Sequence, residues 1–353
     1  MTQHGAKSSP VFVSLGMTIL DELRFSHQKT VFDVPGGSGF FAVFGARLFR
    51  PNPHAAEVGC VVAAGCDLPK TLLSLLESWQ LNLLLLSDAD KPCTRGLLEY
   101  LDDGFGASID IRTGTRFSYT TPPLRPLTDQ LGASSLLHAK SFHFLALPDD
   151  LENQVTTLLR LREEQGITER PLIVWEPAPM GCDSVNLSHH LELCALVDVF
   201  SPNHIELHRL FEGKGETDID FSPPSIEAQA RHFVNVGIGP NQNGVAVIRS
   251  GYHGVLIASK DKRSEWLPAY YGQGSEKVVD ATGAGNAFLG AFAVAFQETS
   301  DPREAAFRGS VAASYAIEQF GPPTLTASNS ESGELWNGSD VLSRLEDLKT
   351  RAL

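Results

Sequence analysis

Short apolar runs alternate with longer stretches of helical spacing along most of this 353-residue chain, and this alternation limits the folds open to it. The apolar runs are typical of buried strands. We expect strands at 10–16, 57–65, 81–88, 141–148, 171–177, 198–202, 244–251 and 254–259. We expect helices at 37–50, 69–79, 149–165, 189–198, 203–211, 284–298 and 302–319. Strands that alternate with helices predict an α/β fold whose central sheet is mainly parallel and carries helices on both faces.

Three segments fall outside this alternation. Residues 22–34 and 105–123 alternate polar and apolar side chains, which is typical of strands with one exposed face. These two segments are therefore expected to pair in a small separate sheet. Residues 321–334 are rich in Pro, Ser and Thr and are expected to pack loosely, whereas residues 339–353 predict a capped terminal helix.

Charge and cysteine content restrict the binding partners and the cellular location expected for this protein. The formal net charge is −14 at pH 7, so the chain lacks the basic surface that nucleic acid binding requires. Five cysteines without a C-x-x-C pair favour reduced thiols over a disulfide framework or a structural zinc site. The polar N-terminus does not resemble a secretory signal, and the apolar runs are too short to span a bilayer. We therefore expect a cytoplasmic protein that binds neither nucleic acid nor membrane.

The segment DATGAGNAF, residues 280–288, contains the first candidate site. Gly283 and Gly285 allow the backbone to approach a ligand closely, and the apolar run that follows predicts a helix. The N–H groups at the start of that helix would point at a bound anion such as a phosphate. The alternative is a plain turn before a core helix, and the loop alone does not decide between the two.

Two further segments supply polar side chains next to expected strands. Asn203 and Glu206 share a face if they lie on a helix, and an amide with a carboxylate suits hydrated Mg²⁺ beside a phosphate site. The alternative is a capping box with Asn203 as the N-cap. Near the N-terminus, Asp21 could accept hydrogen bonds from two hydroxyls next to the glycines of residues 35–39, which suits a polyol. Its alternative is a solvated turn residue.

These segments, in this order, resemble the ribokinase/PfkB carbohydrate kinase family over residues 10–323. The family's nucleotide-side signature is an Asp, two small residues and then Gly-Ala-Gly-Asp. The matching residues are Asp280, Ala281, Thr282, Gly283, Ala284, Gly285 and Asn286. The family's magnesium motif, Asn-x-x-Glu, matches Asn203 and Glu206, and its substrate motifs match Asp21, Gly36 and Gly37. The segments WEPAP (175–179), FSPNHIEL (200–207) and TGAGN (282–286) further resemble the fungal Mak-type (maintenance-of-killer) branch.

The resemblance implies a fold and an activity. The fold would be the ribokinase-like three-layer α/β arrangement over 10–323, with a small β lid formed by about 18–34 and 105–123. Residues 324–353 would be a C-terminal extension that ends in a helix. The activity would be transfer of the γ-phosphoryl group of ATP to a hydroxyl of a sugar or nucleoside-like substrate, with Mg²⁺ and a monovalent cation such as K⁺. An exposed lid sheet could also pair across a homodimer.

The resemblance also implies roles for individual residues. The catalytic loop would comprise Gly283, Ala284, Gly285 and Asn286 and would hold the negative charge that develops during transfer. The nucleotide side would comprise Arg249, Ser250, Gly251, Asp280 and Thr282, with 311–321 lining the adenine pocket and Asp280 helping to form the monovalent-cation site. The substrate side would comprise Asp21, Gly36, Gly37, Ser38 and Phe41. The metal would be held through Asn203 and Glu206, with Glu206 acting on Mg²⁺ through water.

Three positions depart from the family pattern. Asn286 stands where the family has its catalytic Asp, and a neutral amide can orient a hydroxyl but cannot take its proton. Because a general base contributes about 10²–10⁴-fold in rate, an Asn286→Asp substitution is expected to raise phosphotransfer. Phe40 and Phe41 stand near a usual Asn, which favours an apolar or nucleoside-like substrate group unless both rings pack in the core. Arg249 replaces a usual Thr and could reach the ATP phosphates or lie on a surface strand.

The missing acid leaves three functions open. The first is an ATP-dependent kinase of the PfkB type in which Asn286 positions the hydroxyl, because phosphoryl transfer depends mostly on positioning and charge stabilisation. The second is a catalytically weak or inactive pseudokinase that binds a nucleotide or small ligand as a scaffold. The third is an enzyme that reuses the phosphate loop for non-kinase chemistry. Only measured turnover separates the first from the second.

Overall fold

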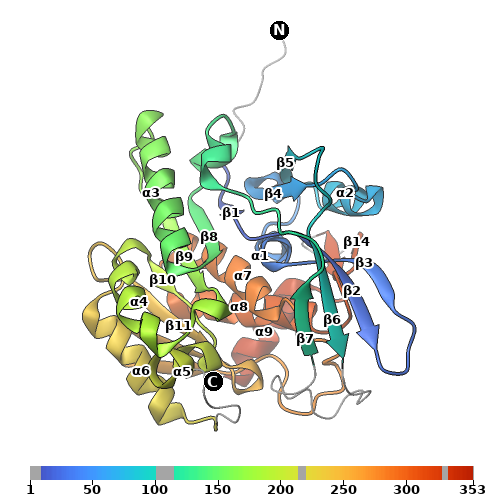
Figure 1. The fold of residues 1–353 in the computed structure, drawn as a ribbon. Helices are drawn as coiled ribbons and strands as arrows, with labels where there is room; N and C mark the ends of the chain where they lie inside the picture. The colour runs from blue at the N-terminus through green and yellow to red at the C-terminus, as the bar shows by residue number, and fades with distance from the viewer. Residues whose placement is uncertain (1–8, 101–114, 214–219, 328–332, 353) are drawn as a thin grey trace.

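The computed structural model describes residues 9–100, 115–213, 220–327 and 333–352. A nine-stranded sheet runs through the centre of the molecule (Figure 1). Its strands lie in the order β13 (Glu265–Leu267), β12 (Val255–Ser259), β11 (Val245–Arg249), β10 (Val199–Phe200), β9 (Leu172–Pro177), β8 (Ser141–Ala146), β1 (Phe12–Ser14), β4 (Val58–Ala64) and β5 (Asn82–Ser87). Neighbours from β11 to β5 are parallel, whereas β12 and β13 pair antiparallel. The expected α/β fold with a mainly parallel sheet is confirmed.

Helices cover both faces of this sheet (Figure 1). One face carries α1 (Ser38–Leu48), α2 (Lys70–Ser78), α7 (Ala284–Thr299), α8 (Pro302–Ala316) and α9 (Val341–Arg351). The other carries α3 (Pro148–Glu164), α4 (Leu187–Leu193), α5 (His204–Glu212) and α6 (Pro223–Val236). Successive residues of β1 point to opposite faces, since Phe12 belongs to one apolar cluster and Val13 to the other. Within the described ranges, no helix has the length and apolar character needed to cross a bilayer.

Short 3₁₀ helices complete the connections between these elements. They are η1 (Ala55–Glu57), η2 (Thr128–Leu131), η3 (Ser135–His138), η4 (Pro179–Gly181), η5 (Ser184–Asn186), η6 (Cys194–Leu196) and η7 (Gly251–His253). The last of these follows β11 directly, so the backbone turns back over the sheet edge immediately after Arg249.

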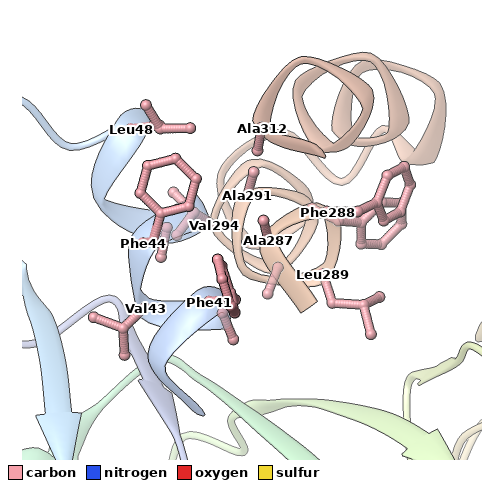
Figure 2. Packing of buried hydrophobic residues seen from close by; sticks show 14 of the residues in the cluster. Phe41, Val43, Phe44, Leu48, Ala287, Phe288, Leu289, Ala291, Val294 and Ala312 are labelled. Atoms are coloured by element: carbon pink, nitrogen blue, oxygen red, sulfur yellow. The ribbon is translucent and has the colours of Figure 1, made fainter. Parts of the chain in front are cut away.

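Close packing of α1 against α7 fixes the start of α7 (Figure 2). A side chain at Gly45 of α1 would overlap the carbonyl oxygen of Ala287, and one at Gly290 of α7 would overlap a carbonyl oxygen of α1. The two backbones therefore touch without an intervening side chain, while Phe41 and Phe44 of α1 pack beside the contact (Figure 2). Because α7 begins at the phosphate loop predicted from the sequence, this contact holds that loop next to α1.

A four-stranded lid sheet lies beside the main body (Figure 1). Its order is β3 (Val31–Gly36), β2 (Ile19–Phe25), β6 (Arg95–Tyr100) and β7 (Thr115–Tyr119). The expected strands within 22–34 are the hairpin of β2 and β3, and β7 lies within the expected segment 105–123. Residues 105–114 of that segment lie outside the described residues. The sequence did not predict β6, which pairs parallel to β2 and thereby joins the two hairpins into one sheet.

The C-terminal segment packs tightly on the main body, and the expectation that 321–334 is loose was wrong for its final residue. β14 (Leu325–Ala327) pairs with β15 (Glu334–Trp336), and the predicted terminal helix is α9. Glu334 is 7% exposed and forms an ion pair at 2.6 Å with Arg47, which is fully buried in α1. Trp336 is also fully buried, and its ring contacts Phe44 and Trp79. The composition of this segment indicated a loop, but it did not indicate that Glu334 and Trp336 are buried.

Candidate functional site

The loop before α7 separates two cavities. Gly283 is the N-cap of α7 and has a left-handed φ of 79°, a conformation that glycine adopts without strain. On one side, Gly285 lines a cavity of about 480 Å³, which is a typical size for a small-molecule site. On the other side, Gly283 and Asn286 line a cavity of about 90 Å³. Two reactants held in these cavities would meet at the loop, as group transfer requires.

The residues predicted from the sequence lie on both sides of this loop. The larger cavity is lined by Asn203, Arg249, Ser250, Gly251, Ala284 and Gly285, together with Ala313, Ser314 and Ile317 from the predicted adenine-side segment. The smaller cavity is lined by Asp21, Gly37, Ser38, Phe41, Thr282, Gly283 and Asn286. Thr282, expected on the nucleotide side, thus faces the smaller cavity. Three predicted residues line neither cavity. Gly36 contacts Asp21, Glu206 contacts Asn203, and Asp280 contacts Thr282.

The side chain of Asn286 is held by Glu176, a residue of β9. The amide nitrogen Nδ2 of Asn286 donates a hydrogen bond to Oε2 of Glu176 at 2.5 Å. An ionised carboxylate can only accept hydrogen bonds, so the NH₂ group of Asn286 must be the end that faces Glu176. The amide oxygen is therefore left to accept a hydrogen bond from a hydroxyl bound in the smaller cavity.

Glu176 lies at the centre of a buried polar network along the carboxyl ends of the parallel strands. It is 5% exposed and contacts Nε2 of His143 at 3.1 Å, while Nδ1 of His143 lies 3.0 Å from the hydroxyl of Ser14. Nη1 of Arg249 forms an ion pair with Oε1 of Glu176 at 2.9 Å. Burial alone would raise the pKa of Glu176, but the Arg249 guanidinium and the hydrogen bond from His143 outweigh it and lower the pKa. Glu176 is therefore ionised at neutral pH.

Sequence reasoning missed Ser14, His143 and Glu176 as parts of the site. Each is a polar residue in one of the apolar strands predicted at 10–16, 141–148 and 171–177. A polar side chain near the carboxyl end of a buried parallel strand points to the place where ligands bind in such sheets. That signal was present for all three residues.

Arg249 lies against the phosphate loop. Its side chain is 12% exposed, and Nη2 donates to the backbone oxygen of Ser201 at 2.9 Å. The guanidinium packs so closely on Gly285 that any side chain at that position would overlap it. Nη2 also lies 3.7 Å from Oε2 of Glu206. A side chain that is only 12% exposed is not that of a surface-strand residue, whereas contact of Arg249 with a phosphate stays a prediction.

The side chains of Asn203 and Glu206, which the resemblance connects with Mg²⁺, form a capping box at the start of α5. Oδ1 of Asn203 accepts from the N–H of Glu206 at 2.8 Å, and Oε2 of Glu206 accepts from the N–H of Asn203 at 2.7 Å. Burial raises the pKa of Glu206 to about 7 despite the nearby Arg249. No group of three His, Cys, Asp or Glu side chains with metal-binding geometry occurs among the described residues. As arranged, these two side chains cap α5 and do not by themselves form a direct coordination site for a divalent cation.

Asp280 is likewise engaged with protein groups. Its Oδ1 accepts from the N–H and the hydroxyl of Thr282, at 3.0 and 2.8 Å, and its Oδ2 accepts from the hydroxyl of Tyr100 at 3.0 Å. Burial raises the pKa of Asp280. Tyr100 belongs to the lid strand β6, so this hydrogen bond ties the lid to the phosphate loop. Both carboxylate oxygens already have protein donors, so the structure gives no support for a monovalent cation at Asp280.

Asp21 is a buried carboxyl group with one unused oxygen. It is 4% exposed, and within the described part of the chain its Oδ1 has no hydrogen-bond partner. The carboxyl group lies between Gly36 and Gly96 on the two neighbouring lid strands, where any side chain would overlap it. Burial, together with the charge of Asp280, raises the pKa of Asp21 to about 7. A group of this kind is well suited to accept hydrogen bonds from ligand hydroxyls, because no protein donor competes for it.

We expect Asp21→Asn to stabilise the ligand-free protein more at about pH 8 than at about pH 5. The pKa of Asp21 is about 7 in the folded protein and 3.8 without the surrounding structure. Because the pKa of Asp21 is raised in the folded protein, its protonated form stabilises the fold. This stabilisation is fully present below pH 3.8 and is lost as the pH rises through about 7. The amide does not ionise and keeps that stability. Urea unfolding at both pH values measures the effect.

The exposed Asp90 provides a matched control for this substitution. Asp90→Asn removes the same charge from a solvated position and should change the unfolding midpoint equally at both pH values. If Asp21→Asn behaves in the same way as Asp90→Asn, Asp21 does not carry the buried charge inferred from its surroundings.

Phe40 and Phe41 both pack in the core, being 0% and 2% exposed. Phe41 nevertheless borders the smaller cavity, and its ring lies directly against Gly283. The core alternative is therefore confirmed for both rings, whereas contact of Phe41 with a substrate stays a prediction. The apolar rings of Phe41 and Phe117 thus line the same small cavity as the acid of Asp21.

Comparison with known proteins agrees with this geometry. Residues 17–328 match the pfkB family carbohydrate kinases. An uncharacterized protein of Schizosaccharomyces pombe is 32% identical over 356 residues, which covers 95% of this chain and 92% of that protein. Protein MAK32 of Saccharomyces cerevisiae is 28% identical over 363 residues, covering 98% and 93%. The expected similarity to fungal Mak-type proteins is therefore confirmed.

A solved structure shows the same fold. Ribokinase from Giardia lamblia superposes with a TM-score of 0.67 at 17% sequence identity, covering 98% of this chain and 99% of that chain. At this identity the superposition establishes the ribokinase-like fold, and the family match extends over most of the chain. This chain belongs to the pfkB family of carbohydrate kinases.

Proposed function

We propose that this protein is an ATP-dependent phosphotransferase of the PfkB type that acts on a hydroxyl of a sugar or nucleoside-like substrate. The observation that carries the proposal is the position of the loop 283–286 between two cavities. ATP would occupy the larger cavity and the hydroxyl-bearing substrate the smaller one. Membership of the pfkB family supports the same assignment of the two sides.

The reaction would take place at the loop between the cavities. The substrate hydroxyl oxygen would form a bond to the γ-phosphorus while the bond from that phosphorus to the bridging oxygen of the β-phosphate breaks, and ADP would leave. Backbone N–H groups at Ala284 and Gly285 would stabilise the negative charge, because they lie at the start of α7. The hydroxyl proton would pass to an oxygen of the transferred phosphoryl group, since Asn286 cannot hold it.

The substrate would be held mainly by Asp21, Asn286 and Phe41. The carboxyl group of Asp21, which lines the smaller cavity, would accept from one hydroxyl, and the amide oxygen of Asn286 would orient the hydroxyl that reacts. The ring of Phe41 gives one wall of the same cavity an apolar surface. The combination favours a sugar that carries an apolar or aromatic group over a small free polyol.

The proposal extends to the setting of the protein. No disulfide joins the five cysteines, all of which lie in the described ranges, and this supports a cytoplasmic location, which fluorescence microscopy of a tagged protein would test. They are Cys60, Cys66, Cys93, Cys182 and Cys194. Val31 and Phe32 on the outer strand of the lid are 45% and 63% exposed and support a homodimer through the lid. Analytical ultracentrifugation would reject the dimer if the chain sediments as a monomer at micromolar concentration.

A pseudokinase is the second candidate, and one observation favours it. The position at which the family places an acid is an amide here, and its NH₂ group is bound by Glu176. A ligand-binding scaffold would need both cavities but no base. In that case ATP would bind without being consumed.

Turnover decides between the two candidates. We expect purified protein to release ADP slowly from ATP in the presence of one member of a panel of sugars and nucleosides. Gly285→Ala should slow that release, because the added methyl group would displace the Arg249 guanidinium from its place against the loop. Gly132→Ala, at a position with room for a methyl group far from both cavities, is the matched control and should keep the wild-type rate.

Three outcomes would count against the kinase. ATP binding without turnover on any member of the panel would favour the scaffold. Turnover that does not require ATP would indicate non-kinase chemistry. An equal rate in Gly285→Ala and Gly132→Ala would show that the loop is not the site of transfer.

A further inference from the structure

The larger cavity has an unusual balance of charge for a site expected to bind a metal–nucleotide complex. Among the described residues that line it, Arg249 is the only Lys or Arg, and there is no Asp or Glu. Divalent cations such as Mg²⁺ prefer carboxylate oxygens, which this lining does not offer. A phosphate group needs a cation and N–H donors, and the lining supplies both through Arg249 and the start of α7.

Arg249 stands between the cavity and two buried carboxylates. Glu176 lies 2.9 Å from Nη1 and Glu206 lies 3.7 Å from Nη2, and these acids are 5% and 6% exposed. The guanidinium therefore compensates the charge closest to the position that a metal ion would need. A divalent ion bound to Glu206 would face the guanidinium at close range, and their repulsion would weaken its binding.

The two ion pairs of Arg249 differ in strength. The contact with Glu176 is a short, buried ion pair, whereas the contact with Glu206 at 3.7 Å is too long for a hydrogen bond. Nη2 is held instead by the backbone oxygen of Ser201. One end of the guanidinium is thus fixed and oriented by Glu176. Nη2 carries two N–H groups, so while one donates to Ser201 the other can donate to a phosphate oxygen.

We propose that Arg249 supplies the positive charge for the phosphates in this cavity, so that the protein binds a nucleoside triphosphate without a divalent metal ion. The guanidinium suits a phosphate oxygen, because it remains charged at all physiological pH values and can donate a charge-assisted hydrogen bond. The identity of the ligand as a nucleotide rests on the proposed function. The independence from metal rests on the charges of the cavity lining and on the capping box that engages Asn203 and Glu206.

Calorimetric titration with ATP, in EDTA and in excess Mg²⁺, tests this inference. We expect the wild-type dissociation constants in the two buffers to agree within about tenfold. Arg249→Thr should weaken binding in EDTA by about tenfold to a hundredfold, because charge-assisted hydrogen bonds to phosphate are lost. The same variant should regain affinity when Mg²⁺ is added, because the metal ion then supplies the positive charge for the phosphates that Arg249 supplied.

Two further variants keep the test independent of folding. Arg249→Lys retains the charge and should keep most of the binding in EDTA, even if Arg249→Thr is unstable because Glu176 has lost its partner. Arg263→Thr removes the same charge from an exposed position outside the cavity and should bind as the wild type does. Thermal unfolding of each variant identifies any that fails to fold.

The possible failures are distinguishable. If the wild type binds ATP only in the presence of Mg²⁺, the inference is wrong and the proposed kinase function stands. If the ratio of affinities with and without Mg²⁺ is the same in the wild type and Arg249→Thr, Arg249 does not replace the metal. If ATP binds in neither buffer, both the inference and the proposed nucleotide site are rejected.

Discussion

Exchanging the acid and the amide between positions 176 and 286, in the double variant Glu176→Gln/Asn286→Asp, is expected to raise phosphotransfer by about 10²–10⁴-fold over the wild type. The exchange keeps the net charge and reverses one hydrogen bond, so that an amide at 176 donates to a carboxylate at 286. The carboxylate then borders the smaller cavity, where it can take the proton of a bound hydroxyl. His143 can adapt to the new amide, because its ring offers one donor and one acceptor and the Ser14 hydroxyl can supply either.

Asn286→Asp alone should gain less than the double variant, although the family resemblance leads one to expect that it restores the base. The new carboxylate would meet Glu176 across the 2.5 Å that now separates the amide from the acid. Two carboxylates at this distance cannot both ionise, so the pair holds one proton near neutral pH. A base that is partly protonated accepts a proton poorly. The rate of Asn286→Asp should therefore rise with pH, whereas the rate of the double variant should not.

Initial rates of ADP formation over a range of pH distinguish these cases. Glu176→Gln alone is the matched control, because it removes the same acid without placing one at 286, and it should show no gain. Equal rates for Asn286→Asp and the double variant at every pH would show that Glu176 does not limit a base at position 286. If no variant forms ADP faster than the wild type, proton transfer does not limit the rate.

The pairing of Asn286 with Glu176 shows where the sequence stops being informative. The Gly-rich loop, the helix after it and the strand that contains Glu176 were all predicted, because each depends on a local pattern of apolar and small residues. The hydrogen bond joins residues 110 positions apart. No local pattern carries information about such a contact. Only the general rule that the carboxyl ends of parallel strands lie at one edge of the sheet could have predicted that these two side chains are close together.

Among the elements that were not predicted, β6 and α6 were missed for opposite reasons. In β6 the apolar pair Leu97 and Leu98 interrupts the alternation by which half-exposed strands are recognised, and the strand depends on tertiary pairing with β2. In α6, by contrast, the buried residues Ile226, Ala230 and Phe233 have clear helical spacing, and two prolines occupy its first turn. That helix could have been predicted from the sequence. For Asn203 and Glu206, the spacing suited both a metal site and a capping box, and local hydrogen bonding realised the second.

Glu334→Ala is expected to lower the free energy of unfolding by about 3–5 kcal/mol, because it leaves the buried guanidinium of Arg47 without its carboxylate. Arg47 is fully buried, and its remaining partners are the backbone oxygens of Trp79 and Arg50. Glu334 also accepts from the backbone and side chain of Asn52, so its loss leaves further donors unsatisfied. Urea unfolding followed by tryptophan fluorescence measures the change, since Trp79 and Trp336 lie beside the ion pair.

Two comparisons separate the buried charge from the loss of a contact. Glu164→Ala breaks an exposed pair with Arg160, whose side chains are 56% and 54% exposed, and should cost less than about 0.5 kcal/mol. Arg47→Met/Glu334→Met removes both charges and should recover much of the stability lost in Glu334→Ala, because a buried ion pair is often no more stabilising than well-packed apolar side chains. A double variant as unstable as the single one would mean that the ion pair itself, and not the stranded charge, holds the C-terminal segment on α1.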